Sequence, residues 1–593
     1  MNQVALYVRD ERGSERVLVD PGPMRPDGTM ALDWYFPSDD AEFVAFGLSE
    51  AGDEDSTLMM LETRSGRFLP DRIPHCRLAA VAFEPDNQTI LYTRYPAPGE
   101  VAPGDEYYYR HVFRHELGQD SRSDRKLFGE GRVKTDFATL ISVSHNGRWA
   151  VLTVMQGWER STLFLRSGLE PFQPFFEGHE NLAYAWFASD RLLALTNYRG
   201  PNYRLVEINP EDPSPDHWDD VVAESEHVLL QAAATSDRLV VHHLGSASSR
   251  VTVCRSDGTF QRPVTLPAMC TVTGIGTDAS LPEAYLTVES FTRPASILEL
   301  DPRSGVAREI LRLDPPAGFH PERYPVRQVR YRSKDGTEVP MFLIGREKER
   351  GPTVLTGYGG FNLSRTPLWT PTIIPFLEGG GLFAVANLRG GGEFGEAWHR
   401  AGRLERKQNV FDDFIAAAEW LIAEGYVARH QLGILGGSNG GLLVGAAMTQ
   451  RPELFGAVVC RVPLLDMVRY QRFKVAELWA DEIGSAQQPE AFLWLHAYSP
   501  YHRVRDGVRY PPILITTGEE DPRVDPMHAR KMAARLQAAN PDGLVLLRVE
   551  RRAGHGMGKP LAKLVPEEAD VWSFLMRHLT NAPRQTVGPH ADT

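Results

Sequence analysis

The chain has 593 residues, of which 42% are hydrophobic, so it is too long for one hydrophobic core and we expect at least two globular domains. Its formal net charge is −13 at pH 7, without long runs of like charge, which argues against a nucleic-acid partner. The 4 cysteines are scattered, and their spacing indicates neither a disulfide framework nor a zinc site. Because no apolar run approaches about 18 residues and the start of the chain lacks a signal-peptide profile, we expect a cytoplasmic protein that does not cross a membrane.

The first half of the chain is predicted to be all-β, because short apolar strands alternate with polar turns and helical patterns are nearly absent. A unit recurs roughly every 40–50 residues, in which an apolar strand leads into a turn of Ser, Pro, Asp or Asn. The turns are Ser38-Asp39, Pro85-Asp86, Ser144–Asn146, Ser189-Asp190, Ser236-Asp237 and Thr277-Asp278. This spacing is typical of the four-stranded blades of a β-propeller. A β-sandwich is the alternative, but its strands need not repeat one turn signature.

Two strand-like runs, Val4–Val8 and Arg16–Val19, precede these repeated units. They resemble half of a further blade. We therefore expect a propeller whose first blade is incomplete in this chain.

The pattern changes near a proline-rich connector at 314–321, where we place the boundary between a propeller domain (1–313) and a second domain (314–593). Beyond it, apolar strands alternate with amphipathic helices, among them one near Asn409–Glu424 and a closing one near Pro566–His578. This alternation predicts an α/β fold with a mainly parallel sheet covered by helices on both faces.

A serine between glycines marks the junction of a strand and a helix in this second domain. The apolar run Leu432–Leu435 leads into Gly436-Gly437-Ser438-Asn439-Gly440, and a further apolar run follows. Glycines two residues to either side of a serine let the strand and the helix pass closely while a strained turn exposes the hydroxyl, as in the nucleophile turn of α/β-hydrolases. Taken alone, the motif also fits a glycine-rich phosphate-binding loop.

The partners of such a serine follow it in this fold, first an acid and then a histidine, each after a later strand. His555 lies in a glycine-flanked loop after the apolar run Leu544–Val549 and fits the general base. Four carboxylates after the strand Ile513–Thr516 compete as the acid that orients it, namely Glu519, Glu520, Asp521 and Asp525. The other histidines considered in this domain are expected at the surface or in capping roles: His399, His496, His502 and His528.

These motifs resemble the prolyl oligopeptidase family of serine peptidases, and the similarity extends along nearly the whole chain. The matching stretches are Tyr358–Asn362, Asn387–Glu396, Gly436–Gly441, Asp521–Val524, Gly554–Pro560 and, in the propeller, Tyr198–Arg204. The resemblance implies a seven-bladed propeller joined to an α/β-hydrolase domain. It also implies that an N-terminal segment of the family is missing here, so we expect that Met1 is not the family's beginning.

The resemblance further implies roles for individual residues. The family's catalytic acid stands two residues before an arginine that binds a substrate carbonyl, which implies Asp521 as the acid of the triad and Arg523 as the carbonyl ligand. The oxyanion hole is implied to consist of the Tyr358 hydroxyl and the backbone N–H of Asn439.

In the family, a proline ring stacks on a tryptophan in the specificity pocket, and the matching residue is Trp479. Its implied apolar neighbours are Phe361, Leu464 and Val524. The chain departs from the family at Leu464, where valine is common, and at Ile483, where tyrosine is common, so we also expect cleavage after alanine. The acids Asp481 and Glu482 do not match the pattern by which the trypsin-like relative oligopeptidase B binds basic side chains.

We therefore expect a monomeric serine endopeptidase that hydrolyses short peptides after proline, uses no cofactor or metal, and has a propeller that restricts substrate size. Two alternatives stay open, an esterase or other acyl hydrolase and a propeller scaffold without catalytic activity. An esterase would have no use for Arg523 or for the propeller, and a scaffold would have no use for an intact triad.

Overall fold

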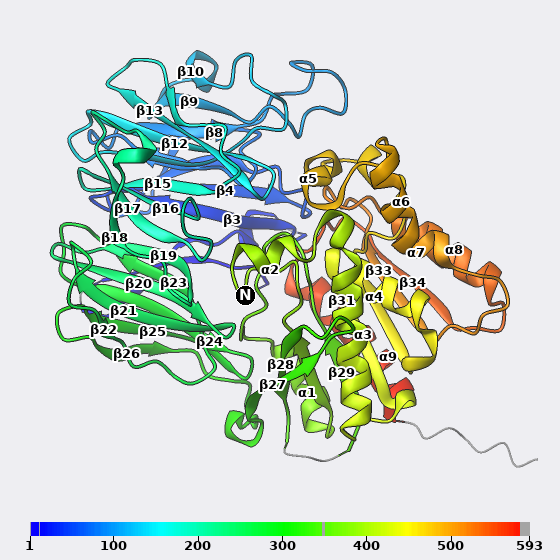
Figure 1. Cartoon of the computed structure of the whole chain (residues 1–593). Helices are drawn as coiled ribbons and strands as arrows, with labels where there is room; N and C mark the ends of the chain where they lie inside the picture. The colour runs from blue at the N-terminus through cyan, green and yellow to red at the C-terminus, as the bar shows by residue number, and fades with distance from the viewer. Residues whose placement is uncertain (1, 11, 26, 347–349, 581–593) are drawn as a thin grey trace, which may run out of the picture.

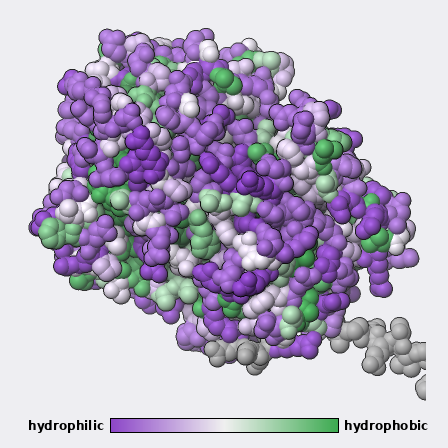
Figure 2. Space-filling model, in the orientation of Figure 1, coloured by the Kyte–Doolittle hydropathy of each residue, from purple (hydrophilic) through white to green (hydrophobic). Residues whose placement is uncertain are grey.

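The computed structural model describes residues 2–10, 12–25, 27–346 and 350–580. The first part of the chain forms a ring of antiparallel sheets, and the second part forms one large sheet between helices (Figure 1). Figure 2 shows that hydrophilic residues cover most of one face of both parts, with apolar residues in small scattered groups. Within the described residues, no helix is both long enough and apolar enough to span a membrane.

Six four-stranded antiparallel sheets, each built from consecutive strands, form the blades in the described part of the propeller. The first strands of these blades line a shared cavity of about 1250 Å³. Apolar side chains of neighbouring blades meet in small cores, such as the one that joins Val151 and Leu163 to Ala185 and Leu192. The blade strands are β3 (Met30–Pro37), β4 (Phe43–Glu50), β5 (Thr57–Glu62), β6 (Phe68–Ile73), β7 (Val81–Phe83), β8 (Thr89–Arg94), β9 (His111–Glu116), β10 (Arg125–Phe128), β11 (Phe137–Val143), β12 (Trp149–Gln156), β13 (Arg160–Ser167), β14 (Gln173–Phe176), β15 (Ala183–Ala188), β16 (Arg191–Thr196), β17 (Arg204–Ile208), β18 (Asp219–Val222), β19 (Val228–Ala234), β20 (Arg238–Gly245), β21 (Ser248–Arg255), β22 (Arg262–Pro263), β23 (Thr271–Thr277), β24 (Ala284–Ser290), β25 (Arg293–Asp301) and β26 (Val306–Arg312).

A two-stranded antiparallel sheet of β1 (Leu6–Arg9) and β2 (Glu15–Val19) lies between the last and the first of these blades. The Arg9 guanidinium donates to a backbone carbonyl of β26, and Arg16 donates to one just after β5. Apolar residues of the two strands pack with those of β4. The expectation of six full units and a partial one is therefore confirmed.

The second domain is built on an eight-stranded sheet with the order β27-β28-β30-β29-β31-β32-β33-β34 among the described residues. The strands β27, β28 and β30 pair antiparallel, and every other neighbouring pair is parallel. Strands covered on both faces are mainly apolar, and all residues of β29 and β30 are buried. The strands are β27 (Val326–Arg332), β28 (Glu338–Ile344), β29 (Thr353–Thr356), β30 (Leu382–Ala386), β31 (Leu432–Gly437), β32 (Ala457–Arg461), β33 (Ile513–Gly518) and β34 (Val545–Glu550).

Helices cover this sheet, and the two longest were predicted with different accuracy. Helix α3 agrees with the prediction to within a residue at each end, whereas α9 begins at Leu561, before the predicted start at Pro566. Proline lacks the N–H of a helical bond, but the buried residues Val571, Trp572 and Leu575 anchor the helix on the sheet. The helices are α1 (Ile374–Glu378), α2 (Glu396–Arg400), α3 (Gln408–Ala423), α4 (Asn439–Gln450), α5 (Ala480–Ile483), α6 (Pro489–Tyr498), α7 (Pro500–Arg503), α8 (Met527–Ala539) and α9 (Leu561–Thr580).

The two domains meet in a backbone-to-backbone contact. A Cβ on Gly554, in the loop after β34, would lie 1.8 Å from the carbonyl oxygen of Gly52, in the turn after β4. A Cβ on Gly52 would likewise lie 2.8 Å from the backbone nitrogen of Gly554. The propeller therefore packs directly on the loop that contains His555. β26 ends at Arg312 and β27 begins at Val326, and the domain boundary between them at 313/314 stays a prediction.

Candidate active site

Ser438 occupies the turn between β31 and α4, with φ 57° and ψ −120°. A positive φ is strained for a residue that has a side chain. A Cβ on Gly436 would lie 2.1 Å from the Gly440 carbonyl oxygen, so the strand and the helix approach this closely only because the position lacks a side chain. The turn holds the serine at the carboxyl end of the strand.

His555 and Asp521 follow β34 and β33, at the carboxyl ends of two neighbouring parallel strands. The His555 Nδ1–H donates to Asp521 Oδ2 over 2.6 Å. Asp521 is fully buried, and its other oxygen accepts the backbone N–H groups of Arg523 and Val524, each at 2.9 Å. These bonds fix the carboxylate and leave the His555 Nε2 as the nitrogen that can accept a proton.

The remaining acids of the same loop lie elsewhere. Glu519 and Glu520 are exposed, and Asp525 accepts the backbone N–H of Met527 at the start of α8. Of the four carboxylates that the sequence left open, Asp521 is the one bonded to His555 in the described structure.

Tyr358 and Asn439 lie beside Ser438. The Asn439 side-chain amide donates to the Tyr358 carbonyl over 2.7 Å, and the backbone N–H of Asn439 stands in the first turn of α4, where helices leave such donors without an intrahelical partner. Burial raises the pKa of the Tyr358 hydroxyl, and a hydrogen bond with the Ser438 side chain offsets part of this rise. The phenol is therefore a neutral donor at pH 7. Among the described residues, no hydrogen bond links Ser438 with His555.

The pocket residues predicted from the sequence gather in one apolar cluster. Phe361, Leu464 and Val524 are buried members, and the half-buried Trp479 packs against them. The rings of Trp479 and Phe361 meet edge to face with 6.4 Å between their centroids. The indole also lies parallel to the Tyr470 ring, at 6.5 Å. Because Trp479 remains partly exposed, a flat apolar ring can bind there.

The propeller contributes to this cluster a residue that the sequence did not single out. Trp158 lies in the turn between β12 and β13, and its ring meets that of Phe361 with 4.8 Å between centroids. The sequence contains one clue to this contact, because tryptophan is unusual in hairpin turns, which favour Gly, Asn, Asp and Ser. Its partner belongs to the other domain and could not be identified from local pattern.

Arg523 is also tied to the propeller. Its Nε donates to Glu54 Oε2 over 2.9 Å, and the same oxygen accepts from Arg77 over 2.8 Å. The Glu54 side chain is 2% exposed and that of Arg523 is 31% exposed. The ion pair holds the guanidinium at its Nε, and the outer nitrogen Nη2 donates to the Met557 sulfur over 2.9 Å.

Two of the histidines that were expected at the surface or in capping roles, His399 and His528, are buried. His399 is completely buried between Glu396 and Glu482, and His528 is 2% exposed and accepts two successive backbone N–H groups after β32. Burial lowers the pKa of His528 to about 4, so it acts as a neutral acceptor. His496 is exposed, as expected. The local sequence gave no sign of burial, because Glu482 and the backbone groups that bind His528 come from distant segments.

The fold and these side chains define an α/β-hydrolase that carries a β-propeller domain. The sequence profile named Prolyl oligopeptidase family matches residues 369–582, and that of its N-terminal beta-propeller domain matches residues 1–312. The chain belongs to the prolyl oligopeptidase family.

Several similar proteins span most of the chain. It is 32% identical over 588 residues to the prolyl endopeptidase of Elizabethkingia miricola. This alignment covers 97% of this chain and 82% of the relative. It is 31% identical to prolyl oligopeptidase A of Amanita bisporigera, over 94% of this chain and 78% of the relative.

Solved structures agree with these matches. A chain from a structural and mechanistic comparison of two prolyl endopeptidases is 39% identical, with a TM-score of 0.93 over 98% of this chain and 86% of that chain. Prolyl oligopeptidase B from Galerina marginata, bound to a 35mer substrate, is 27% identical, with a TM-score of 0.90 over 98% of this chain and 85% of that chain.

We predict that Gly436→Ala lowers the turnover of a chromogenic peptide by at least about 100-fold, because the new methyl group would displace the turn that positions Ser438. The matched control is Gly276→Ala in β23, where a Cβ would meet its nearest neighbour at an ordinary 3.8 Å. Steady-state kinetics with both purified variants checks this, and normal turnover by Gly436→Ala would contradict it.

Proposed function

We propose that this protein is a serine endopeptidase that hydrolyses short peptides on the carboxyl side of proline. The proposal is carried by the convergence, in one site, of Ser438, the bonded pair His555–Asp521 and the partly exposed indole of Trp479. Prolyl endopeptidases and prolyl oligopeptidases among the similar proteins support it. We also propose that it is a monomer in the cytoplasm; the net charge of −13 favours solubility and disfavours a nucleic-acid partner.

The reaction proceeds through an acyl-enzyme. His555 Nε2 takes the proton of Ser438 as the serine oxygen attacks the carbonyl carbon of the scissile bond, and it then gives that proton to the leaving amine. Asp521 holds the imidazole through its Nδ1–H and stabilises the imidazolium. Water attacks the acyl-serine with the same base, which releases the new carboxyl end and restores the serine.

Tyr358 links substrate binding to activation of the nucleophile. Its hydroxyl interacts with the Ser438 side chain, which offsets part of the rise in its pKa. A scissile carbonyl oxygen that binds between this hydroxyl and the Asn439 N–H takes the place of the serine, and Ser438 is released to pair with His555. Each donor to the developing oxyanion contributes ~10²–10³ in rate, because it stabilises charge that appears only in the transition state.

Specificity arises from a flat apolar pocket. The proline ring stacks on Trp479, the walls are Phe361, Leu464 and Val524, and Arg523 donates to the preceding substrate carbonyl. Ile483 is completely buried and adds no polar group to the pocket. A substrate with a smaller residue, such as alanine, in place of proline therefore also fits this pocket. An esterase would need neither Arg523 nor a propeller that contacts the pocket.

Access to this site is limited by the propeller. Trp158 packs on Phe361, and Gly52 packs on Gly554 next to the catalytic histidine, so the propeller borders the site at the interface between the domains. A flexible peptide can enter such a space, whereas a folded protein cannot for steric reasons.

Ser438→Ala is expected to reduce turnover of a proline anilide by about 10⁴-fold or more with the melting temperature retained, because no nucleophile remains. Labelling by a fluorophosphonate should disappear in the same variant. Residual activity above about 5% of the parent would show that another residue is the nucleophile.

Trp479→Ala is expected to impair cleavage after proline at least about tenfold more than cleavage after alanine, because only the proline ring gains from stacking. Arg523→Ala should weaken both substrates to a similar extent, since it binds a backbone carbonyl. Paired measurements of kcat/KM on the two anilides decide this. Equal losses in the tryptophan variant would refute stacking.

A short proline-containing peptide should be cleaved, while the same sequence inside a stably folded protein should survive under identical conditions. The control is the same protein after denaturation and carboxymethylation, cut to fragments that match the free peptide in length. Mass spectrometry of the products checks this, and equal rates for the folded protein and the peptide would exclude steric restriction.

A further inference from the structure

Glu482 is a buried carboxylate that no step of the proposed reaction uses. It lies in α5, just after Trp479 in the chain, and is 1% exposed. Its Oε1 accepts the backbone N–H of Phe361 over 2.8 Å, and its Oε2 is bonded to the Nε2 of His399 over 2.8 Å. The Glu482 carboxylate therefore links the segment that contains Trp479 to the loop that begins at Tyr358.

That loop requires support because its backbone is strained. Phe361 and Asn362 have φ values of 59° and 57°, in the left-handed region that residues with side chains rarely adopt. The polar contacts that hold it run from Asn439 Nδ2 to the Tyr358 carbonyl at 2.7 Å, from Lys407 Nζ to the Gly359 carbonyl at 2.8 Å, from the Phe361 N–H to Glu482 at 2.8 Å and from the Asn362 N–H to the Gly390 carbonyl at 3.2 Å. The loop carries both the proposed oxyanion donor and a wall of the pocket, so its position affects both.

Buried cations compensate the charge of Glu482. Burial disfavours the charged form of His399, but hydrogen bonds to Glu396 and Glu482 outweigh it and raise the pKa of His399 to about 9. Burial lowers the pKa of Lys407 to about 8, although the charge of Glu482 opposes this. Both side chains are therefore mainly protonated at pH 7, and the bonds that Glu482 accepts are charge-assisted.

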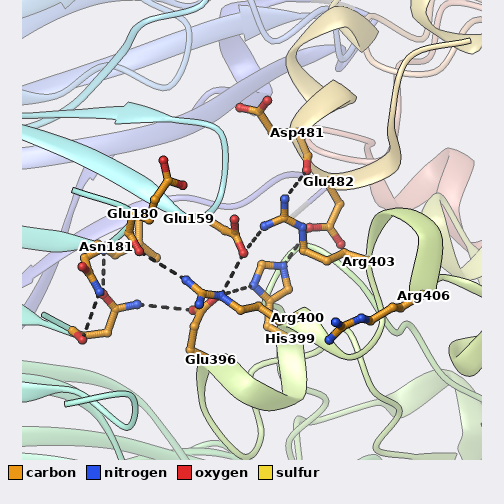
Figure 3. A network of polar contacts seen from close by, with 12 residues as sticks. Glu159, Glu180, Asn181, Glu396, His399, Arg400, Arg403, Arg406, Asp481 and Glu482 are labelled. Atoms are coloured by element: carbon orange, nitrogen blue, oxygen red, sulfur yellow. Dashed lines mark hydrogen bonds and ion pairs between the residues drawn. The ribbon is translucent and has the colours of Figure 1, made fainter. Parts of the chain in front are cut away.

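The network continues to the propeller, as Figure 3 shows. Glu159, in the hairpin turn between β12 and β13, is bonded to Arg400 at 3.1 Å and to Arg403. The ligand-type atoms of Glu159, Glu396 and His399 lie within 4.8 Å of one another. Because Arg400 also contacts Glu396, at 3.3 Å, guanidinium groups already satisfy these carboxylates, and the cluster is an ion-pair network rather than a metal site.

We propose that Glu482 is a positioning residue for the reaction: through the Phe361 N–H it holds the loop where the Tyr358 hydroxyl meets the substrate carbonyl, and His399 fixes its carboxylate. The proposal rests on the proposed function, in which Tyr358 is an oxyanion donor. Glu482 acts through the backbone of the loop and touches no substrate. Displacing a catalytic group by about 1 Å costs on the order of 10²-fold in rate, so a loosened loop has a measurable effect.

A double-mutant cycle on kcat/KM for a proline anilide tests this. Glu482→Met removes the acceptor at similar side-chain length and should lower kcat/KM about 30-fold in the parent, but at least about threefold less in the Tyr358→Phe background, where the donor is already absent and only the displaced Phe361 wall still costs activity. Glu482→Gln restores an acceptor oxygen and should recover activity to within about threefold of the parent. The matched control is Asp481→Asn, the partly exposed acid next to it, which should change kcat/KM by less than about twofold in both backgrounds.

Equal losses from Glu482→Met in the two backgrounds would overturn the proposal, since a general loss of stability multiplies both rates alike. A Glu482→Gln variant as impaired as Glu482→Met would also overturn it. If Glu482→Met does not fold, Glu482→Asp, one methylene too short to reach both partners, is measured in the same cycle and judged by the same coupling. Tyr358→Phe alone should cost about 100-fold; if it costs nothing while Ser438→Ala is inactive, the oxyanion role of Tyr358 is wrong, and the positioning role falls with it.

Discussion

The active site depends on how closely β31 and α4 pass each other at Ser438. The turn exists because Gly436 leaves room for the Gly440 carbonyl, and it produces two functional groups at once. It exposes a hydroxyl, and it begins a helix whose first backbone N–H groups lack intrahelical acceptors. The sheet then places Asp521 and His555 after the adjacent strands β33 and β34, so their 2.6 Å contact follows from strand order and not from long loops.

Much of this architecture could be predicted because it is encoded in local patterns. The interval between polar turns indicated propeller blades, and alternating strands and helices indicated a mostly parallel sheet. The nucleophile turn and the histidine loop were visible as glycine-flanked motifs. The acid was not decided by pattern, because the choice among four carboxylates depends on a turn that directs the backbone N–H groups of Arg523 and Val524 at Asp521.

The features that sequence pattern missed all depend on packing between distant segments. Trp158 and Glu54 come from the propeller, and each contacts a residue of the other domain far along the chain. His399 was expected at the surface or in a capping role, and nothing in the local sequence singled out Glu482. They are buried because each is the other's partner, and a buried charge is stable only when its compensating groups are in place. Pairings of this kind carry no local signature.

The contact between Gly52 and Gly554 limits how such an enzyme can be altered. A methyl group at either position would collide with the backbone of the other domain, and the collision would occur one residue from the catalytic histidine. The two domains are therefore not interchangeable modules. A chimaera could combine this hydrolase domain with another propeller only if that propeller also had a turn without a side chain at the position of Gly52. With a side chain there, the loop that contains His555 would be displaced.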